Sequence, residues 1–400
     1  MFSGNQPSGR PAGQADGDSG HSGRCFMKKH VNYYFLTVVI ILMVAGALFL
    51  ATLSAPASLQ TFGNTNYYLF HQLFAILIGF ILATVAFKIP LHVLKKIAPI
   101  ILAVNLLLLV VVFLPVVGTK FWGAKRWISI GQNTIQPSEF LKITSIIYLA
   151  SWLSAKLSES SKKGWIFTVK KGYHNFVRMF LPFLFLLGMI TIILFFQKDV
   201  STLGIIGITL LVVYFASGLP FWHTLLLMIS GILGSALLIK IEPYRAQRFL
   251  TFLHPESDPL GRGFQLKQSL MAMGSGGIFG KGLGMSTQKF GFLPQAMSDS
   301  IFAILGEETG IVGTSILIII FLLFLWQGFK IARSATDTFS KLTSVGITFW
   351  ILFQAFVNIS SAIGIFPLSG IPLPFLSYGG SHIVAEMIGV GIMLNISKNG

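Results

Sequence analysis

The chain has 400 residues, of which 54% are hydrophobic and only 10% are charged. A soluble globular domain carries about 25% charged residues, so this composition excludes that class and indicates an integral membrane protein. The formal net charge of +16 does not indicate nucleic-acid binding, because the Lys and Arg residues are scattered and no DNA-binding motif is present. In a membrane protein such a charge is typical of basic loops and of contacts with anionic lipid head groups.

The N-terminal segment, 1–30, is rich in Gly, Ser and Pro and lacks apolar periodicity, so we expect a disordered tail. It contains Cys25, the only cysteine of the chain, and therefore no internal disulfide is possible. The apolar run that follows, 33–53, is longer than the hydrophobic core of a signal peptide. We interpret it as an uncleaved membrane helix.

The rest of the chain, 31–400, contains ten segments with the roughly 20 apolar residues that a membrane-spanning helix needs. We therefore expect an all-α, polytopic membrane domain with spans at 33–53, 67–87, 94–114, 137–155, 177–196, 201–217, 220–240, 299–326, 342–365 and 372–396. An even number of spans puts both termini on one side. The segments on that side hold more Lys and Arg than the others, which predicts that both termini are cytoplasmic.

Two substantial loops lie on the opposite side, at 115–136 and 241–298. The second is by far the longest, and its Pro, Gly and short apolar stretches favour re-entrant or interfacial pieces over a soluble domain. Within it, 274–284 (GSGGIFGKGLG) superficially resembles a phosphate-binding loop. No strand precedes it, so we do not infer nucleotide binding. Its glycines instead permit sharp turns or close contact with a ligand.

Asp299 follows this loop, where a long apolar helix is expected to begin. Acidic residues are rare, with 13 Asp and Glu in the whole chain, and one at the mouth of a membrane helix is costly unless it has a partner or a function. If Pro294 opens the helix, Gln295 and Asp299 lie one turn apart on one face. Alternatively, Ser298 or Asp299 is simply the helix N-cap; the two interpretations are compatible.

Cations on the same side of the membrane need an anionic partner. Arg245 and Arg248 are spaced at i, i+3 and could bind a pyrophosphate through bidentate contacts. They could equally extend from the interface toward lipid head groups. Lys267 and Lys289 are further candidates. A carboxylate near such cations suits an acid–base reaction on a phosphate-linked lipid better than hydrolysis.

Other polar positions have both structural and functional interpretations. Arg126 lies in a Lys-Arg-Trp sequence typical of an interfacial anchor. Glu139 stands in the first turn of a predicted span, where the helix dipole favours a carboxylate. Asp199 lies in a tight turn between two spans. Glu386 lies deep in the last span, where it is either a functional intramembrane acid or the partner of His382 in a local hydrogen bond.

A series of short motifs follows a fixed order along the chain: GAKRWI (123–128), QPSE (136–139), QKD (197–199), GFQ (263–265), QS (268–269), GLG (282–284), LPQA (293–296) with Asp299, IFA (301–303), EE (307–308) and PLPFLSYGGS (372–381). In these motifs the sequence resembles the SEDS family (shape, elongation, division and sporulation), which includes FtsW, RodA and SpoVE, and most closely its cell-division branch. The resemblance extends from about residue 33 to residue 396.

The resemblance implies a ten-helix enzyme of the bacterial cytoplasmic membrane that polymerises lipid II into glycan strands. It implies a class B penicillin-binding protein as the cross-linking partner, together with other cell-division proteins. Asp299 would be the general base of an inverting transfer; a divalent cation, Mg²⁺ or Mn²⁺, could assist, and no organic cofactor or dedicated metal-ligand set is expected. We expect substrate-binding residues at Arg245, Arg248, Lys267, Gln268, Lys289, Gln295, Arg126, Glu139, Asp199, Ser377, Gly379, Gly380 and Ser381.

The sequence departs from the family pattern at Gln295, where the family usually has Glu. A Glu there could tune the pKa of the aspartate or hold a metal, so the Gln leaves those two roles open but not the role of Asp299 as the base. Two alternative functions remain. A lipid II flippase would need polar residues through the membrane, and Lys142, His382 and Glu386 are the deep candidates. A non-catalytic scaffold of the division machinery would need none. Polar groups concentrate on the outer side, which favours the enzyme.

Overall fold

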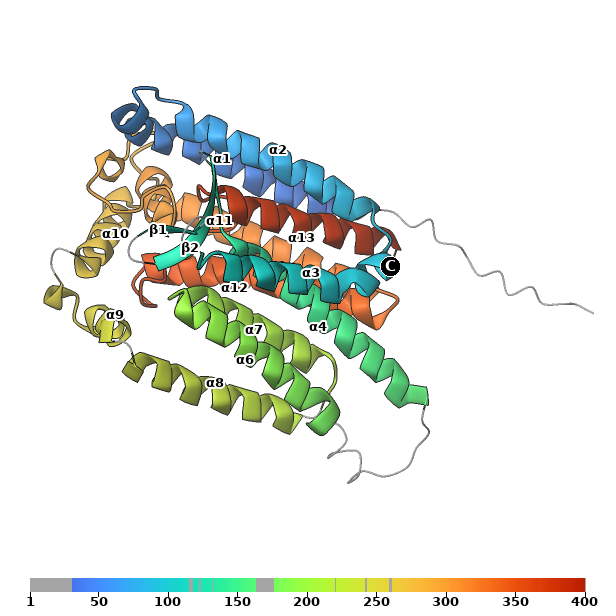
Figure 1. The fold of residues 1–400 in the computed structure, drawn as a ribbon. Coiled ribbons are helices and arrows are strands. Elements are labelled where there is room, and N and C mark those ends of the chain that lie inside the picture. Colours follow the sequence, from blue (N-terminus) through green and yellow to red (C-terminus); the bar gives the residue numbers. More distant parts are fainter. Residues whose placement is uncertain are drawn as a thin grey trace, which may run out of the picture.

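The structure is a computed structural model that describes residues 31–114, 118–121, 124–131, 133–162, 176–219, 221–241, 243–258 and 261–399. The predicted tail, 1–30, lies outside the described residues. The described chain forms a bundle of long helices with one small sheet (Figure 1). The helices are α1 (Tyr33–Phe62), α2 (Tyr67–Lys88), α3 (Leu91–Val111), α4 (Pro137–Lys162), the π-helix η1 (Phe176–Phe180), α6 (Leu181–Phe196), α7 (Val200–Ala216), α8 (Phe221–Ile241), α9 (Pro243–Leu253), the 3-10 helix η2 (Pro255–Ser257), α10 (Arg262–Gly276), the 3-10 helix η3 (Gln288–Phe290), α11 (Ile301–Ser334), α12 (Thr338–Ala362) and α13 (Gly380–Asn399).

Eight helical segments of the described chain are long and apolar enough to cross a membrane: α1, α2, α3, α4, the η1–α6 segment, α11, α12 and α13. Two shorter apolar helices complete this part of the bundle: α7 packs beside α6, and α8, whose apolar part is short, packs beside α7. Helices dominate because only a helix satisfies all of its own backbone hydrogen bonds within lipid. The prediction of an all-α polytopic membrane protein is confirmed, and each of the ten predicted spans overlaps one of these helices.

Several boundaries differ from the prediction. The final span begins at Gly380 and not at residue 372, because the proline-containing segment 371–379 is irregular and proline resists a helix interior. The predicted loop 115–136 contains an antiparallel sheet of strand order β1-β2-β3, made by β1 (Gly118–Phe121), β2 (Ala124–Ile130) and β3 (Asn133–Ile135).

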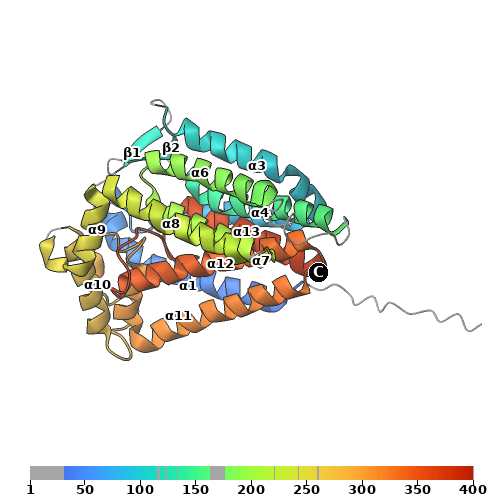
Figure 2. The same ribbon diagram turned by 90° about the horizontal axis from the view of Figure 1, so that it is seen from below.

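Most of the non-helical structure gathers at one end of the bundle, which we call the site end. The sheet, α9, α10 and the start of α11 lie there, and the C-terminus lies at the opposite end (Figures 1 and 2). The helices differ in how far they are enclosed: 72% of the α12 span and 78% of the α13 span is buried, against 22% of the α2 span. The inner helices α12 and α13 can therefore carry polar residues away from lipid.

α11 is broken near its start, at Gly310, whose φ of +65° lies outside helical values. A break leaves carbonyl groups of the first part of the helix without their usual partners. The loop that follows α10 supplies replacements, because Lys281 N donates to Glu307 O at 2.9 Å and Gly282 N to Glu308 O at 3.0 Å. The glycine-rich loop is thus a structural cover for the break in α11.

Candidate functional site

Asp299 lies in a turn at the site end, directly before α11. Its Oδ1 atom accepts a hydrogen bond from Ser298 Oγ at 3.1 Å, and its Oδ2 atom lies 3.5 Å from Gln265 Nε2 of α10. Its main-chain carbonyl accepts a hydrogen bond from Asn358 Nδ2 of α12 at 2.9 Å. Groups from α10 and from the turn therefore orient the carboxylate, and α12 holds its backbone.

The predicted helix from Pro294 is wrong. Residues 294–300 form turns, in which Ser298 N and Ser300 N both donate to Gln295 O, at 3.0 and 3.2 Å, and Gln295 adopts a positive φ of +54°. The residue that precedes α11 is Ser300, so neither Ser298 nor Asp299 is the N-cap. Gln295 still reaches the site, because its Oε1 atom lies 2.9 Å from Ser298 Oγ and competes with Asp299 for the one hydroxyl hydrogen.

A second irregular segment, 370–378, packs against this turn. Ser377 Oγ donates to the carbonyl oxygen of Ser298. Asn358 joins the two segments, because the same Nδ2 group that contacts Asp299 also donates to Ile371 O at 2.7 Å. Gly370 lies so close that a Cβ atom added there would be 4.0 Å from Asp299 Oδ2. The site is thus built where two irregular segments, distant in sequence, meet.

The pKa of the Asp299 carboxyl is raised above its ordinary value, mainly because burial disfavours the ionised form. Hydrogen bonds, including those from Ser298 and Gln265, and the positive charge of Arg248 act in the opposite direction. The residue is nevertheless partly exposed, so a substrate hydroxyl can approach it. A carboxylate with a raised pKa in an accessible position has the properties of a general base.

Two arginines lie at the site end, on α9 and α10, and one of them, Arg248, is close enough to Asp299 to affect its pKa. Arg248, on α9, donates from Nη1 to Ser201 Oγ at 3.4 Å. Arg248 and Arg262 also line one small cavity of about 10 Å³, together with Thr251, Phe252, Leu266 and Leu368. This volume corresponds to about one water molecule, so the cavity would have to open to accept a phosphate group.

The structure separates the other predicted cations. The side chain of Arg245 lies outside the described residues. Lys267 and Gln268 lie on α10 close in sequence to Gln265, with Lys267 exposed, and neither side chain forms a hydrogen bond or ion pair with the part of the chain that the structure describes. Lys289 is instead buried, and its Nζ atom lies 3.6 Å from Glu308 Oε1. Lys289 therefore stabilises the loop that covers α11.

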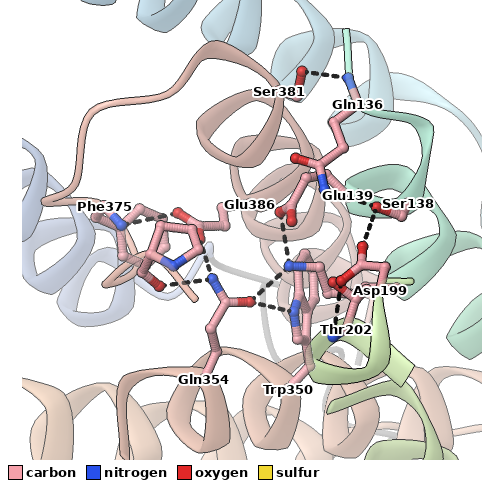
Figure 3. A network of polar contacts seen from close by, with 12 residues as sticks. Gln136, Ser138, Glu139, Asp199, Thr202, Trp350, Gln354, Phe375, Ser381 and Glu386 are labelled. Carbon is pink, nitrogen blue, oxygen red and sulfur yellow. Dashed lines mark hydrogen bonds and ion pairs between the residues drawn. The ribbon is translucent and has the colours of Figure 1, made fainter. Parts of the chain in front are cut away.

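Arg126 and Asp199 form a cluster of their own. Arg126 Nη1 lies 3.8 Å from Asp199 Oδ1, and Arg126 Nε donates to Gln197 O at 3.0 Å. Asp199 caps α7 by accepting from Thr202 N at 3.4 Å, and Ser138 Oγ donates to its other oxygen at 3.1 Å (Figure 3). These contacts attach strand β2 to the starts of α4 and α7, a structural role.

Glu139 belongs to a buried network that connects α4, α12 and α13 (Figure 3). Lys142 Nζ lies 2.7 Å from Glu139 Oε2 and 2.8 Å from Gln354 Oε1. Gln354 Nε2 lies 3.4 Å from Glu386 Oε1 and 3.1 Å from the carbonyl of Pro372, and Glu386 Oε2 accepts from Phe375 N at 2.9 Å. Glu386 thus bonds Gln354 and the irregular segment, so the alternative of a local bond with His382 is wrong.

The remaining predicted residues fix the start of α13. Gly379 N donates to Gln72 Oε1 of α2 at 3.0 Å, and Ser381 Oγ accepts from Gln136 N at 3.0 Å. Gly380 packs against α2, since an added Cβ atom would lie 3.5 Å from a methyl group of that helix. These residues hold the start of α13 against α2 and against the residue that precedes α4, and they do not contact Asp299.

Asn358 was not among the predicted site residues, and Gln265 was noted only as part of the GFQ motif. The available signal for Asn358 is that a polar amide in a long apolar helix needs a partner.

The fold and the site define a multi-pass helical membrane protein with an accessible carboxylate at one end of its bundle. Residues 32–400 match the model of the FtsW/RodA/SpoVE family, described as cell cycle proteins. The chain belongs to this family, and the resemblance inferred from its motifs is confirmed.

Curated relatives match over most of their length. The chain is 35% identical over 361 residues to stage V sporulation protein E of Bacillus subtilis, which covers 90% of this chain and 95% of that protein. It is also 35% identical over 360 residues to the probable peptidoglycan glycosyltransferase FtsW of Coxiella burnetii, which covers 89% of this chain and 93% of that protein.

Solved structures share the fold. One chain, from work on the structural coordination of polymerization and crosslinking by a peptidoglycan synthase complex, has a TM-score of 0.72 at 24% identity and covers 92% of this chain and 98% of its own. The rod shape determining protein RodA of Thermus thermophilus has a TM-score of 0.66 at 23% identity, with 92% and 97% covered. At these identities the likeness is evidence for the fold alone.

Proposed function

We propose that the protein is a peptidoglycan glycosyltransferase that polymerises lipid II into glycan strands at the outer face of the bacterial cytoplasmic membrane during cell division. Its family membership and its identity to relatives named as probable peptidoglycan glycosyltransferases support this. The observation that carries the proposal is the accessible Asp299 carboxylate, which has a raised pKa and lies within the electrostatic influence of Arg248.

In the proposed step, the 4-hydroxyl oxygen of the acceptor sugar attacks the anomeric carbon of the lipid-linked donor. The hydroxyl proton passes to the Asp299 carboxylate as the new carbon–oxygen bond forms. The bond from the anomeric carbon to the pyrophosphate oxygen breaks, and its electron pair leaves with the lipid pyrophosphate. A single displacement inverts the anomeric configuration. No second carboxylic acid is needed, because pyrophosphate is already a good, anionic leaving group.

The negative charge that develops on the pyrophosphate needs cations. We assign this role to Arg248 and to Arg262, which lines the same cavity, with Arg245 on the same helix α9. The described residues contain no group of three potential metal ligands. A divalent ion, Mg²⁺ or Mn²⁺, would supply further charge neutralisation and would depend on the phosphate substrate for most of its ligands. Rates measured after chelation, and again after each ion is restored, test this part.

We also propose that both termini are cytoplasmic, because Lys and Arg are more frequent in the segments that share their side. The site end would then lie at the outer surface. A class B penicillin-binding protein is the proposed partner, with other division proteins, on the strength of the family resemblance. Labelling of single cysteines from each side of the membrane tests the orientation, and co-purification tests the partner.

The decisive experiment is polymerisation of lipid II by the purified protein, with and without the class B partner, beside Asp299→Asn. Asp337→Asn is the matched control: Asp337 caps α12 at the opposite end of the bundle, where its Oδ2 atom accepts from Ser340 N at 3.0 Å. Loss of a general base should lower the rate by about 10²–10⁴-fold, whereas the control should keep it.

Two failures are distinguishable. Wild-type rates for Asp299→Asn would remove this residue as the base while leaving the enzyme class intact. An inactive wild-type protein, even with the partner and divalent ions present, would contradict the proposal that the protein is a glycosyltransferase. Head-group movement across protein-containing vesicles would then test the flippase.

A further inference from the structure

The loop between α10 and α11 presents a run of exposed apolar side chains. Phe279 is 80% exposed, Leu283 69% and Met285 68%, and Ile278 is exposed as well. We call residues 278–285 the apolar tip. Clustered exposed apolar residues of this kind mark a surface that contacts a partner or a membrane.

The apolar tip is held rigidly in its exposed position. The backbone bonds from Lys281 and Gly282 to the broken part of α11 fix its middle. The buried carboxylate of Glu307 adds an ion pair to Lys281 Nζ at 2.7 Å and accepts from Thr287 N and Oγ1 at 3.2 and 3.0 Å. The apolar side chains therefore cannot turn inward unless this anchor breaks.

The apolar tip lies where the lipid-facing part of α11 begins. Ile311 N donates to Gly277 O at 3.0 Å and Val312 N to Ile278 O at 3.1 Å, so the tip adjoins the first turn after the break. Ile311 is itself 64% exposed, and exposed apolar residues continue along the helix at Ile316, Ile319 and Trp326. The exposed apolar surface of the tip is thus continuous with the exposed apolar side of α11. Because α11 is a membrane-spanning helix, this continuity favours lipid over a soluble partner as the surroundings of the tip.

We infer that the apolar tip inserts into the lipid leaflet at the site end, so that the loop is embedded in the membrane surface. Lys281, in the middle of the tip, does not place an unpaired charge in the leaflet, because its ammonium group is neutralised by the Glu307 carboxylate. α10 lies across the same end of the bundle (Figure 2) and carries Gln265. The inserted tip would hold α10 at head-group level, where a lipid-linked molecule can meet Asp299 without leaving the bilayer. The insertion itself does not rest on the proposed function.

Site-directed spin labelling of the full chain in vesicles tests this. Cys25 is the only cysteine, so Cys25→Ser gives a cysteine-free background. Nitroxide labels would be attached in Phe279→Cys and Leu283→Cys, with Ile319→Cys as the lipid-exposed reference on α11. Ser257→Cys, an exposed position at the same end, is the water-exposed reference. Collisions with oxygen, which concentrates in lipid, are compared with collisions with a water-soluble nickel complex, in vesicles of phosphatidylethanolamine and phosphatidylglycerol.

We expect the labels at 279 and 283 to resemble the label at 319, with an oxygen-to-nickel collision ratio several-fold higher than at 257. A ratio equal to that at 257 would overturn the inference, because the tip would then lie in water. Protection from both reagents would also overturn it, in favour of a protein cover by a second copy or a partner. The two labelled positions guard against a local effect of either substitution.

Discussion

Replacement of Asn358 by alanine should slow glycan synthesis while the protein remains folded. The Asn358 Nδ2 group donates to the carbonyls of Asp299 and Ile371, at 2.9 and 2.7 Å, and so joins the two segments that form the site. Asn358→Ala leaves both carbonyls without this donor. A buried polar group that loses its partner costs about 1–3 kcal/mol, so the pair should cost about 2–6 kcal/mol of stability.

Asn395 provides a matched control at the opposite end of the bundle. Its Nδ2 group likewise donates to two main-chain carbonyls, those of Ala86 at 3.0 Å and Ile89 at 2.6 Å. Asn395→Ala should therefore lower the melting temperature in detergent by a similar amount. Only Asn358→Ala releases the backbone of Asp299, and a displacement of about 1 Å at a reacting group can cost about 10²-fold in rate. We expect kcat to fall by about 10–100-fold, with the KM for lipid II changed much less.

The assay is the initial rate of glycan formation from labelled lipid II, measured over a range of concentrations well below the melting temperature of each variant. Wild-type kcat in Asn358→Ala would refute the reasoning. So would an equal fall of kcat in both alanine variants, because the loss would then follow stability and not the position of Asp299. Asn358→Asp, which keeps the shape but replaces the donor by an acceptor, should be at least as slow as the alanine variant.

Three further predictions concern other parts of the molecule. Because the pKa of Asp299 is raised, the acidic limb of the kcat/KM profile against pH should lie above the range of an ordinary aspartate. Arg248→Gln removes a positive charge that lowers this pKa, so it should move the acidic limb to higher pH. A limb that does not move would argue against Asp299 as its source. Lys142→Met leaves the buried Glu139 unpaired and should cost about 3–5 kcal/mol, which a second substitution, Glu139→Gln, should partly restore in thermal unfolding. Gly310→Ala places a side chain at a φ of +65° and against the carbonyl oxygen of Ile278, so it should lower the free energy of unfolding by more than about 1 kcal/mol. It should also speed proteolysis of the loop between α10 and α11. An unchanged cleavage rate would mean that this loop does not depend on the break in α11.

The spans were predictable because lipid imposes the same demand on every segment, a continuous apolar helix. The turn before α11 was not. Pro294 and the spacing of Gln295 and Asp299 favour a helix locally, and nothing nearby forbids one. What overrides this preference is the contact with segment 370–378, where Ser377 bonds the carbonyl of Ser298. A single sequence does not reveal a contact between segments so far apart.

The same limit applies to side chains whose partners lie on other helices. Asp299 was identifiable because it is one of few acids and falls within a known motif. Asn358 offers only the weaker signal of an amide in an apolar helix, and both of its acceptors are main-chain atoms. Main-chain acceptors leave no trace in the sequence, so the function of such a residue appears only once the helices are packed.

The buried network also restricts the order in which the helices can enter the membrane during synthesis. α4 carries Glu139 and Lys142 three residues apart in one ion pair, so it brings its own counter-charge into lipid. α13 brings Glu386, whose bonding partners are Gln354 on α12 and the segment before α13 itself. A lone carboxylic acid in lipid is costly. The helix that carries an acid without a counter-charge of its own is thus inserted into a bundle that already holds its partner Gln354.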